Sequence, residues 1–528
     1  MLARTLRSAL CRSPTTRSTT GASASAARAA LGPRRLAGLT TRAAEPMDGK
    51  RQAPPAAKRQ RTTLSAVAQA SGVTPTHEPG RSFSVPGLHV REHAFVVPLD
   101  YSGRQDSPYA GRTITLFARE LLTPARNENL PFLVYLQGGP GFEAPRPLEA
   151  CMWIKPALAS HRVVLLDQRG TGASTPITTA NLAKRGGAEQ QAEYLALFRA
   201  DSIIRDCEAV RHLLVPPANH GGKWAVLGQS FGGFCVATYL SLYPEGILEA
   251  LITGGLPPGL ASPCSADAVY GVLHGRVLAA NAKYYDRFPG DVSQVQRIVA
   301  YLAAQPGGGA VLPSGTRLTP RLLQTLGLAG LGAGGSFERL HYLLDSFFDA
   351  EGDMTPTFAK SFEAWQSWDT NPLYALLHEA IYCQGGEASA WAADRVRSSE
   401  RFAAAFDAEA AVAEGRPVMF TGECVYRFMY DDVAALRPYK ATADALAART
   451  EWGPLYDPAM LTANRVPVAA LSYVEDLYVD YNLSMETAAG IRGLKLWVTN
   501  EYRHSGIRDD GGRIFDRLLG MARNVVFD

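Results

Sequence analysis

Short apolar runs separated by polar and amphipathic stretches dominate the chain from about residue 90 to residue 256. Two early segments, EHAFVVPLDY and RTITLFARE, alternate apolar and polar residues as antiparallel strands do. The next four runs, PFLVYLQ, HRVVLLD, KWAVLG and LEALITGG, are continuously apolar, which is typical of strands covered on both faces of a parallel sheet. An amphipathic stretch with helical spacing, DSIIRDCEAVRHLL, separates the second run from the third. This alternation predicts an α/β fold with a mostly parallel, doubly wound sheet and helices on both faces.

The pattern changes over residues 257–463, where helical segments rich in aromatic residues alternate with glycine-rich loops. Strand patterns return in RVPVAALSYV and GLKLWVTN, and the helical pattern RIFDRLLGMA closes the chain. We therefore expect a sheet domain made of residues 81–256 and 464–528, with residues 257–463 inserted as a helical domain between two late strands. Residues 1–80 are expected to be a transit peptide followed by a disordered linker.

The charge of the chain is unevenly distributed. The net charge of the 528 residues is +3, but residues 1–62 hold 13 Lys and Arg against only Glu45 and Asp48, so the remainder is acidic. A nucleic-acid partner is therefore not expected. A segment rich in Arg, Ser, Thr and Ala with no acid before Glu45 predicts import into a chloroplast or mitochondrion. A disordered tail on a cytoplasmic protein is the alternative.

Neither a membrane span nor a metal site is expected. No window approaches the roughly 18 consecutive apolar residues that a membrane helix needs. The chain has seven cysteines, but they form no CxxC pair and no Cys/His cluster at metal-ligand spacing. They are typical of reduced, mostly buried thiols. Their positions are Cys11, Cys151, Cys207, Cys235, Cys264, Cys383 and Cys424.

The strongest chemical motif follows KWAVL. Gly228, Ser230 and Gly232 form a GxSxG sequence where a strand pattern passes into a helix pattern. A tight strand-to-helix turn holds such a serine in a strained conformation with its hydroxyl exposed above the sheet. This context favours a nucleophilic Ser230 over an ordinary turn residue.

Two further loops follow neighbouring strand patterns. In QGGPGF, the backbone N–H of Gly139 could pair with the N–H of Phe231 to bind a developing oxyanion, although a plain Gly/Pro turn is the alternative. In DQRGTGAS, we expect Asp167 and Arg169 to hold the loops in place rather than to touch a substrate.

A base and an acid follow the last two strand patterns. His504 comes after KLWVTN, and Glu475 and Asp476 come after VPVAALSYV. The order Ser, acid, His is the one expected for a hydrolase of this architecture. His504 would accept the proton of Ser230, and Asp476, which we favour over Glu475, would orient the imidazole.

The motifs GGPG, DQRGTGAS and GQSFGG, with the late Asp and His, resemble those of the proline iminopeptidases. This resemblance covers about residues 90–528 and implies an α/β-hydrolase fold with a helical cap. It also implies removal of an amino-terminal residue, often proline, from peptides with a free amino terminus. Cap glutamates bind the substrate amine in this family, which implies that role for Glu423, in GECVYRF, or else for Glu379, in LLHEAIY.

The chain departs from the family pattern at three places. Gln137 stands where a His commonly precedes GGPG, Arg503 stands where a Gly commonly precedes the His, and Tyr473-Val474-Glu475 replaces a Gly-containing approach to the acid. None of these changes removes a reacting group. They place the chain in a divergent branch of the family that it resembles.

The sequence therefore predicts a serine aminopeptidase that works through an acyl-enzyme and requires no metal or organic cofactor. Two alternatives remain open. One is a carboxylester or lipid hydrolase with the same triad, and the other is a non-catalytic binding protein on this fold. The GxGxxG match at Gly330–Gly335 follows a helix pattern rather than a strand, so a dinucleotide site is not expected.

Overall fold

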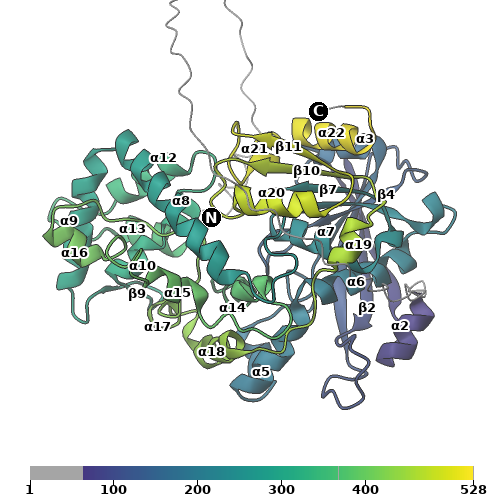
Figure 1. Cartoon of the computed structure of the whole chain (residues 1–528), viewed down its shortest axis with the longest axis horizontal. Helices are drawn as coiled ribbons and strands as arrows, with labels where there is room; N and C mark the ends of the chain where they lie inside the picture. Colours follow the sequence, from purple (N-terminus) through teal and green to yellow (C-terminus); the bar gives the residue numbers. More distant parts are fainter. Residues whose placement is uncertain (1–62, 367, 527–528) are drawn as a thin grey trace, which may run out of the picture. The chain divides into compact units, whose positions relative to one another are not determined.

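A nine-stranded sheet runs through the computed structural model, which describes residues 63–366 and 368–526 (Figure 1). The predicted transit peptide lies outside these residues, so it stays a prediction. In spatial order the strands are β1-β2-β3-β5-β4-β6-β7-β10-β11. Their bounds are β1 (Thr76–Val85), β2 (Leu88–Pro98), β3 (Thr113–Leu122), β4 (Phe132–Leu136), β5 (Arg162–Asp167), β6 (Trp224–Gln229), β7 (Ile247–Thr253), β10 (Val468–Tyr473) and β11 (Leu494–Thr499).

The sheet is mostly parallel, as the continuously apolar runs predicted. Strands β1, β2, β3 and β5 pair antiparallel at one edge. From β5 onward, each strand pairs parallel with its neighbours β4, β6, β7, β10 and β11. The carboxyl ends of these parallel strands therefore meet at one edge of the sheet, where an open α/β sheet collects functional groups.

The predicted disordered linker is wrong for residues 63–80. Helix α2 (Leu64–Ser71) begins with the Thr63 hydroxyl accepting from the N–H of Ala66, and it ends at Gly72 with a φ of 71°. Strand β1 follows and forms a hairpin with β2. Most side chains of β1 are exposed, so its order comes from backbone pairing with β2 rather than from an apolar pattern that could have predicted it.

Helices cover both faces of the sheet, and each face has its own hydrophobic core. On one face, Val134 of β4 packs in a cluster with Ile204 of α6. On the other, Leu133 of the same strand packs in a cluster with Phe515 of α22. The helices of the sheet region are α3 (Ile154–Ser160), α4 (Thr179–Ala183), α5 (Ala188–Leu195), α6 (Ala200–Leu214), α7 (Phe231–Leu242), α20 (Tyr481–Gly490), α21 (Gly506–Asp509) and α22 (Gly511–Ala522).

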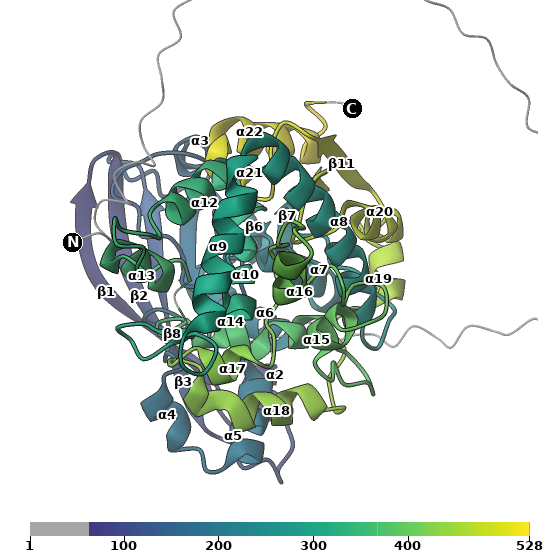
Figure 2. The ribbon, with the colours of Figure 1, turned by 90° about the vertical axis from the view of Figure 1, so that its left-hand side faces the viewer.

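A helical segment lies between β7 and β10 and is drawn in teal to green beside the sheet in Figure 1. Figure 2 looks onto its two long helices, α8 and α9, which contact each other. Leu273 of α8 and Phe420 belong to the same cluster as Val134, so one continuous core joins this segment to the sheet. Its helices are α8 (Ala266–Arg287), α9 (Gly290–Ala304), α10 (Pro320–Gln324), α11 (Gly327–Gly330), α12 (Ser336–Asp345), α13 (Pro356–Glu363), α14 (Pro372–Leu377), α15 (Ala392–Arg397), α16 (Ala408–Ala413), α17 (Met429–Asp432), α18 (Lys440–Ala448) and α19 (Pro458–Thr462).

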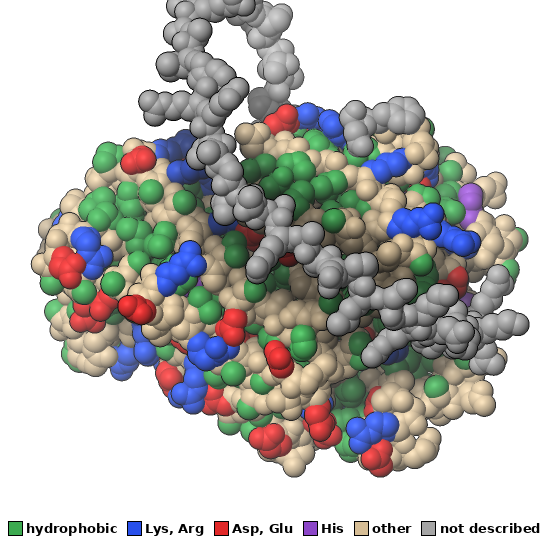
Figure 3. All heavy atoms as spheres, in the orientation of Figure 1, with side chains coloured by type: hydrophobic (Ala, Val, Ile, Leu, Met, Phe, Trp, Pro, Cys, Tyr) green, Lys and Arg blue, Asp and Glu red, His purple; other side chains and the backbone are tan. Residues whose placement is uncertain are grey.

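Acidic and basic side chains are interspersed over the helical segment on the face shown in Figure 3. Ion pairs on the surface of the helical segment include Arg427 with Asp444 and Arg395 with Asp267. Among the residues that the structure describes, no helix combines the length and the apolar character needed to cross a membrane.

Candidate active site

Three parallel strands deliver the predicted triad to the same edge of the sheet. Ser230 follows β6 directly, Asp476 comes three residues after β10, and His504 comes five residues after β11. Strand β7 lies between β6 and β10, and β11 pairs with β10. The order of the strands therefore brings side chains that are far apart in sequence into contact.

Ser230 occupies the strained turn that its motif predicts. Its φ of 56° and ψ of −126° fall outside the regions that an L-residue prefers, and helix α7 starts at the next residue. The flanking glycines leave no room for a side chain. A Cβ on Gly228 would lie 2.3 Å from the carbonyl oxygen of Gly232, and a Cβ on Gly232 would lie 1.9 Å from that of Leu136. Close packing of the strand on the helix thus holds the serine in place.

The three polar side chains form a continuous hydrogen-bonded relay. The Ser230 hydroxyl donates to Nε2 of His504 over 2.9 Å, and Nδ1 of His504 donates to Oδ2 of Asp476 over 2.8 Å. A carboxylate can only accept, so its bond to Nδ1 places the proton of the neutral imidazole on Nδ1. Ser230 is 9% exposed, so its hydroxyl lies in a sheltered site.

The acid of the relay is Asp476 and not its neighbour. Oδ1 of Asp476 accepts from the N–H groups of Tyr478 and Val479, at 2.8 and 3.0 Å, which leaves Oδ2 for His504. Glu475 is exposed and pairs with Lys283 instead. Burial favours the neutral form of the His504 imidazole, but the charge and hydrogen bond of Asp476 outweigh it and raise the pKa of His504 above its ordinary value.

The histidine loop is held by the helical segment. The ring of Tyr478 packs on His504 with centroids 4.5 Å apart, and a Cβ on Gly332 would lie 2.1 Å from the Tyr478 ring. Arg503 donates to the carbonyl oxygen of Leu331 over 2.9 Å. Gly332, one glycine of the GxGxxG match, thus allows close packing next to the triad. The Arg503 side chain makes a hydrogen bond that a glycine at this position could not make.

The QGGPGF loop lies against the serine turn. A Cβ on Gly138 would lie 2.9 Å from Cβ of Ser230, so the backbone of this loop approaches the hydroxyl closely. Gly139, the next residue, has a φ of 137° that glycine adopts readily. Gln137, which replaces the family His, accepts from the Tyr135 hydroxyl through its side chain and from Gln168 through its carbonyl oxygen.

Asp167 and Arg169 support the loops, as their positions predicted. The fully buried Asp167 carboxylate accepts from the N–H groups of Ala144 and Ala173, one in each loop, and from Arg146. The buried guanidinium of Arg169 makes a bidentate pair with Asp206. Both charges are therefore satisfied inside the protein.

Glu423, in the helical segment, lies within electrostatic reach of His504 and Asp476. It lies in an irregular stretch between α16 and α17 and is partly exposed. Its Oε1 accepts from the Tyr374 hydroxyl over 2.9 Å. Burial raises the pKa of Glu423 to about 7, and the charges of His504 and Asp476 act on it from across the site. This carboxylate therefore has an ionisation state that a positive ligand could change.

The second predicted glutamate, Glu379, is engaged by backbone amides. Glu379 is buried, and its two carboxylate oxygens accept from the N–H groups of Ala392 and Ala393 at the start of α15. Burial raises the pKa of Glu379, against the effect of these hydrogen bonds. Helix α15 thus uses this side chain for its own first turn.

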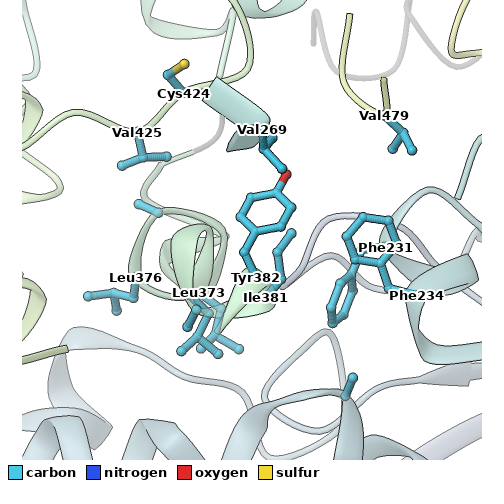
Figure 4. Close-up of a cluster of buried hydrophobic side chains, with 14 of the residues drawn as sticks. Phe231, Phe234, Val269, Leu373, Leu376, Ile381, Tyr382, Cys424, Val425 and Val479 are labelled. Atoms are coloured by element: carbon cyan, nitrogen blue, oxygen red, sulfur yellow. The ribbon is translucent and has the colours of Figure 1, made fainter. Parts of the chain in front are cut away.

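An apolar wall of buried side chains lies next to the serine turn, because Phe231 directly follows Ser230. Figure 4 shows Phe231 and Phe234, from α7, beside Tyr382 from the helical segment. The rings of Phe234 and Tyr382 have centroids 6.2 Å apart. Val269 and Val479 belong to the same group of buried side chains. The wall combines residues of the sheet region and of the helical segment, which favours an apolar group next to the hydroxyl.

Sequence reasoning missed Tyr374 and Tyr478. Tyr478 follows Asp476 by two residues, so a search for aromatic residues that flank the acid could have found it. Tyr374 offers no such signal, because its contact joins α14 to a loop 49 residues later. No group of three His, Cys, Asp or Glu that could hold a metal ion occurs among residues 63–366 and 368–526.

Comparison with known proteins assigns the family. A profile described as alpha/beta hydrolase fold matches residues 131–300. A proline iminopeptidase of Aeromonas sobria is 46% identical over 439 residues, which cover 83% of this chain and 97% of that protein. The proline iminopeptidase aneH of Aspergillus aculeatus is 36% identical, over 82% of this chain and 94% of its own.

Solved structures are more distant. An enol-lactonase from Burkholderia xenovorans is 11% identical, covers 78% of this chain and 97% of its own, and has a TM-score of 0.34. The two curated relatives confirm the family predicted from GGPG, DQRGTGAS and GQSFGG. The chain belongs to the proline iminopeptidase family of α/β hydrolases.

Proposed function

We propose that this protein is a serine aminopeptidase that releases the amino-terminal residue, above all proline, from peptides with a free amino terminus. The observation that carries this proposal is the pairing of two features in one site. The relay of Ser230, His504 and Asp476 can attack an acyl carbon, and the Glu423 carboxylate interacts electrostatically with His504 and Asp476 of that relay. The first feature serves hydrolysis, and the second can select a substrate with a positive charge.

In the proposed mechanism, the Ser230 hydroxyl attacks the first peptide carbonyl while its proton passes to Nε2 of His504. Asp476 keeps Nδ1 of the imidazole protonated and stabilises the imidazolium that forms. The imidazolium then gives its proton to the leaving amine. A water molecule repeats the sequence on the acyl-enzyme and frees Ser230.

The backbone amides of Phe231 and Gly139 are the proposed donors to the oxyanion. Phe231 is the first residue of α7, so its N–H has no partner within the helix and lies at the positive end of the helix dipole. The loop that carries Gly139 lies against the serine turn. Removing one such donor typically costs about 3 kcal/mol of transition-state stabilisation.

Glu423 is the proposed binding group for the substrate ammonium. A charge-assisted hydrogen bond to the ammonium would stabilise the ionised carboxylate, which burial otherwise disfavours. A substrate with a blocked amine would leave this charge unpaired, and such a mismatch is penalised strongly in a sheltered site. The apolar wall of Phe231, Tyr382 and Val479 suits the flat aliphatic ring of proline next to the hydroxyl.

The test compares three substrates on the full chain: a prolyl arylamide, its N-acetylated form and a short-chain aryl ester. We expect the free-amine amide to be cleaved with the highest kcat/KM and the acetylated form to be nearly inert. An alanyl arylamide should be cleaved less well than the prolyl one. Ser230→Ala, with an unchanged circular dichroism spectrum, should abolish all of these activities.

The result that would overturn the proposal is faster hydrolysis of the ester, with no effect of blocking the amine. The protein would then be a carboxylester hydrolase with the same serine. Unchanged turnover by Ser230→Ala would instead show that the relay does not carry the reaction.

A further inference from the structure

Two cysteines lie side by side where the helical segment joins the sheet region. Cys264 precedes α8, and Cys383 directly follows the short helix Glu379–Tyr382. They are opposite residues of an isolated antiparallel bridge, 119 residues apart in sequence. Their Sγ atoms are 3.5 Å apart, and both are free thiols. At this distance the two sulfurs are in contact but are not covalently bonded.

The backbone around this pair favours bond formation. The N–H of Ser265 donates to the carbonyl oxygen of Tyr382, and the N–H of Gln384 donates to that of Pro263. These two bonds flank the cysteines, so Cys264 and Cys383 form a non-hydrogen-bonded pair. Opposite Cα atoms in such a pair are about 4.5 Å apart, which lies within the range of about 4.4 to 6.8 Å that disulfides span. The sulfurs can therefore bond with a small local movement.

The two thiols differ in access and in ionisation. Cys264 is partly exposed, whereas Cys383 is buried. The contact between the two sulfurs lowers the pKa of Cys264 and raises the pKa of Cys383, whose thiol also donates to the carbonyl oxygen of Glu379 over 3.6 Å. A lowered pKa enlarges the thiolate fraction of Cys264, and the thiolate is the reactive form. Cys264 thus has the features of an attacking thiol, and Cys383 those of a resolving one.

We propose that Cys264 and Cys383 are an oxidation site that a peroxide closes to a reversible disulfide, and that closure slows turnover. In the first step the Cys264 thiolate attacks one oxygen of hydrogen peroxide, the O–O bond breaks, and the products are a sulfenic acid and hydroxide. In the second step the Cys383 sulfur attacks the Cys264 sulfur, the S–O bond breaks, and the thiol proton leaves with the hydroxyl group as water. Two thiols are oxidised and one peroxide is reduced.

The expected effect on turnover follows from the position of Cys383. The residue before it, Tyr382, belongs to the apolar wall beside Phe231, and its carbonyl oxygen accepts within the cysteine bridge. The carbonyl oxygen of Cys383 is bound by the buried Arg199 over 2.5 Å. Closing the gap between the sulfurs from 3.5 Å to bonding distance, about 2.05 Å, changes the torsions of both cysteines and is expected to shift the segment that carries Tyr382 slightly. A shift of this size near a reacting centre can lower the rate many-fold.

The test treats the reduced full chain with a small excess of hydrogen peroxide, caps free thiols with iodoacetamide, and maps the peptides by mass spectrometry. We expect one linked peptide pair joining Cys264 to Cys383 and loss of their capping. Turnover should fall at least threefold, and dithiothreitol should restore both the thiols and the activity. Cys264→Ser should keep its activity under peroxide, and the matched control Cys151→Ser, which changes another partly exposed thiol, should respond as the wild type does.

The proposal is overturned if Cys264 and Cys383 are both capped after peroxide treatment, or if the disulfide forms and turnover stays constant. It is also overturned if Cys264→Ser loses activity under peroxide as the wild type does. Because the peptide map needs no variant and no activity, it stays decisive even if a substitution disturbs folding. It is also independent of the substrate that the protein cleaves.

Discussion

The serine turn and the loop that carries Glu423 hold their functional side chains by different means. Ser230 sits between a strand and a helix that approach so closely that the flanking positions Gly228 and Gly232 exclude any side chain. Glu423 lies in an irregular stretch whose position depends on distant partners. Its carboxylate accepts from Tyr374, and a Cβ on the preceding Gly422 would lie 2.5 Å from Val277 of α8. Local geometry thus places the reacting group, whereas tertiary packing places the group proposed to recognise the substrate.

The two glutamates predicted for amine binding sharpen this contrast. In sequence both lie in predicted helical regions and precede aromatic residues by a few positions. In the structure Glu379 binds the first amides of α15, and of the two it is Glu423 whose charge acts on His504. A residue type and a nearby motif are therefore enough to find a triad, but not to find a recognition residue in a helical cap.

The largest effect is expected at the triad, from Asp476→Asn. The amides of Tyr478 and Val479 require an oxygen at the Oδ1 position, so the new NH₂ group would face Nδ1 of His504. That arrangement moves the imidazole proton to Nε2, so Nε2 can no longer accept a hydrogen bond from the Ser230 hydroxyl. We expect kcat to fall by about 10⁴-fold with little change in KM, measured with a prolyl arylamide.

The matched control is Glu475→Gln, which alters the exposed neighbouring acid and its pair with Lys283. It should stay within about twofold of the wild type, since exposed ion pairs contribute little. Activity of Asp476→Asn within tenfold of the wild type would contradict the assignment of the relay.

The difference between placement by local geometry and placement by tertiary packing explains how far the sequence could predict the fold and the site. Ser230, Asp476 and His504 each follow an apolar strand pattern within a few residues, and the parallel order of the strands then brings them together. Strand β1 was missed because most of its side chains are exposed and its order comes from pairing with β2. Tyr374 was missed because nothing in the local sequence of α14 indicates its contact with Glu423.

The second largest effect is expected in the helical segment, from Glu423→Gln compared with Glu379→Gln. A hydrogen bond to a charged partner contributes about 1.5 to 3 kcal/mol, so Glu423→Gln should lower kcat/KM for free-amine amides about 10- to 100-fold. It should leave hydrolysis of the aryl ester unchanged. Glu379→Gln should leave this selectivity intact and instead lower the free energy of unfolding by about 1 to 3 kcal/mol, because one buried amide of α15 loses its acceptor.

A measurement of thermal stability shows whether Glu423→Gln disturbs folding. Because the folded-state pKa of Glu423 is raised to about 7, the folded protein binds its proton more tightly than the unfolded chain does, and this stabilisation is lost as pH rises through 7. The Gln variant lacks that loss, so at pH 8 its Tm should be no lower than that of the wild type. Equal losses of free-amine selectivity in both variants would remove the distinction between the two glutamates.

A smaller effect is expected from pH alone. Only the ionised Glu423 can pair with an ammonium, so the ratio of kcat/KM for the free-amine amide to kcat/KM for the ester should fall as pH falls. With a pKa of about 7 for the carboxyl and about 7.7 to 8.0 for the substrate amine, the ratio should drop about five- to sixfold from pH 7.5 to pH 6. Titration of His504 affects both substrates and cancels in this ratio. A ratio that is independent of pH in the wild type, or that falls equally in Glu423→Gln, would exclude Glu423 as the titrating group.

The smallest effect is expected from Tyr374→Phe, which tests whether the helical segment positions Glu423 through one hydroxyl. The variant removes the donor to Oε1 of Glu423 and keeps the ring that packs between Phe142 and Trp368. A hydrogen bond of this kind contributes about 0.5 to 1.5 kcal/mol, so KM for free-amine amides should rise about two- to tenfold with kcat unchanged. The same bond lowers the pKa of Glu423, so its loss should also move the fall in the amide-to-ester ratio to higher pH.

A purely structural role of Tyr374 would lower stability without moving this pH profile. Tyr270→Phe is the matched control. Its ring packs on another aromatic ring, that of Tyr382, while its hydroxyl has no hydrogen-bond partner among the residues that the structure describes. If both variants behave alike, packing alone would hold Glu423 in place. If only Tyr374→Phe moves the profile, a single contact between α14 and a loop 49 residues later sets the ionisation of the proposed recognition group, while the position of Ser230 depends on how its strand ends and its helix begins.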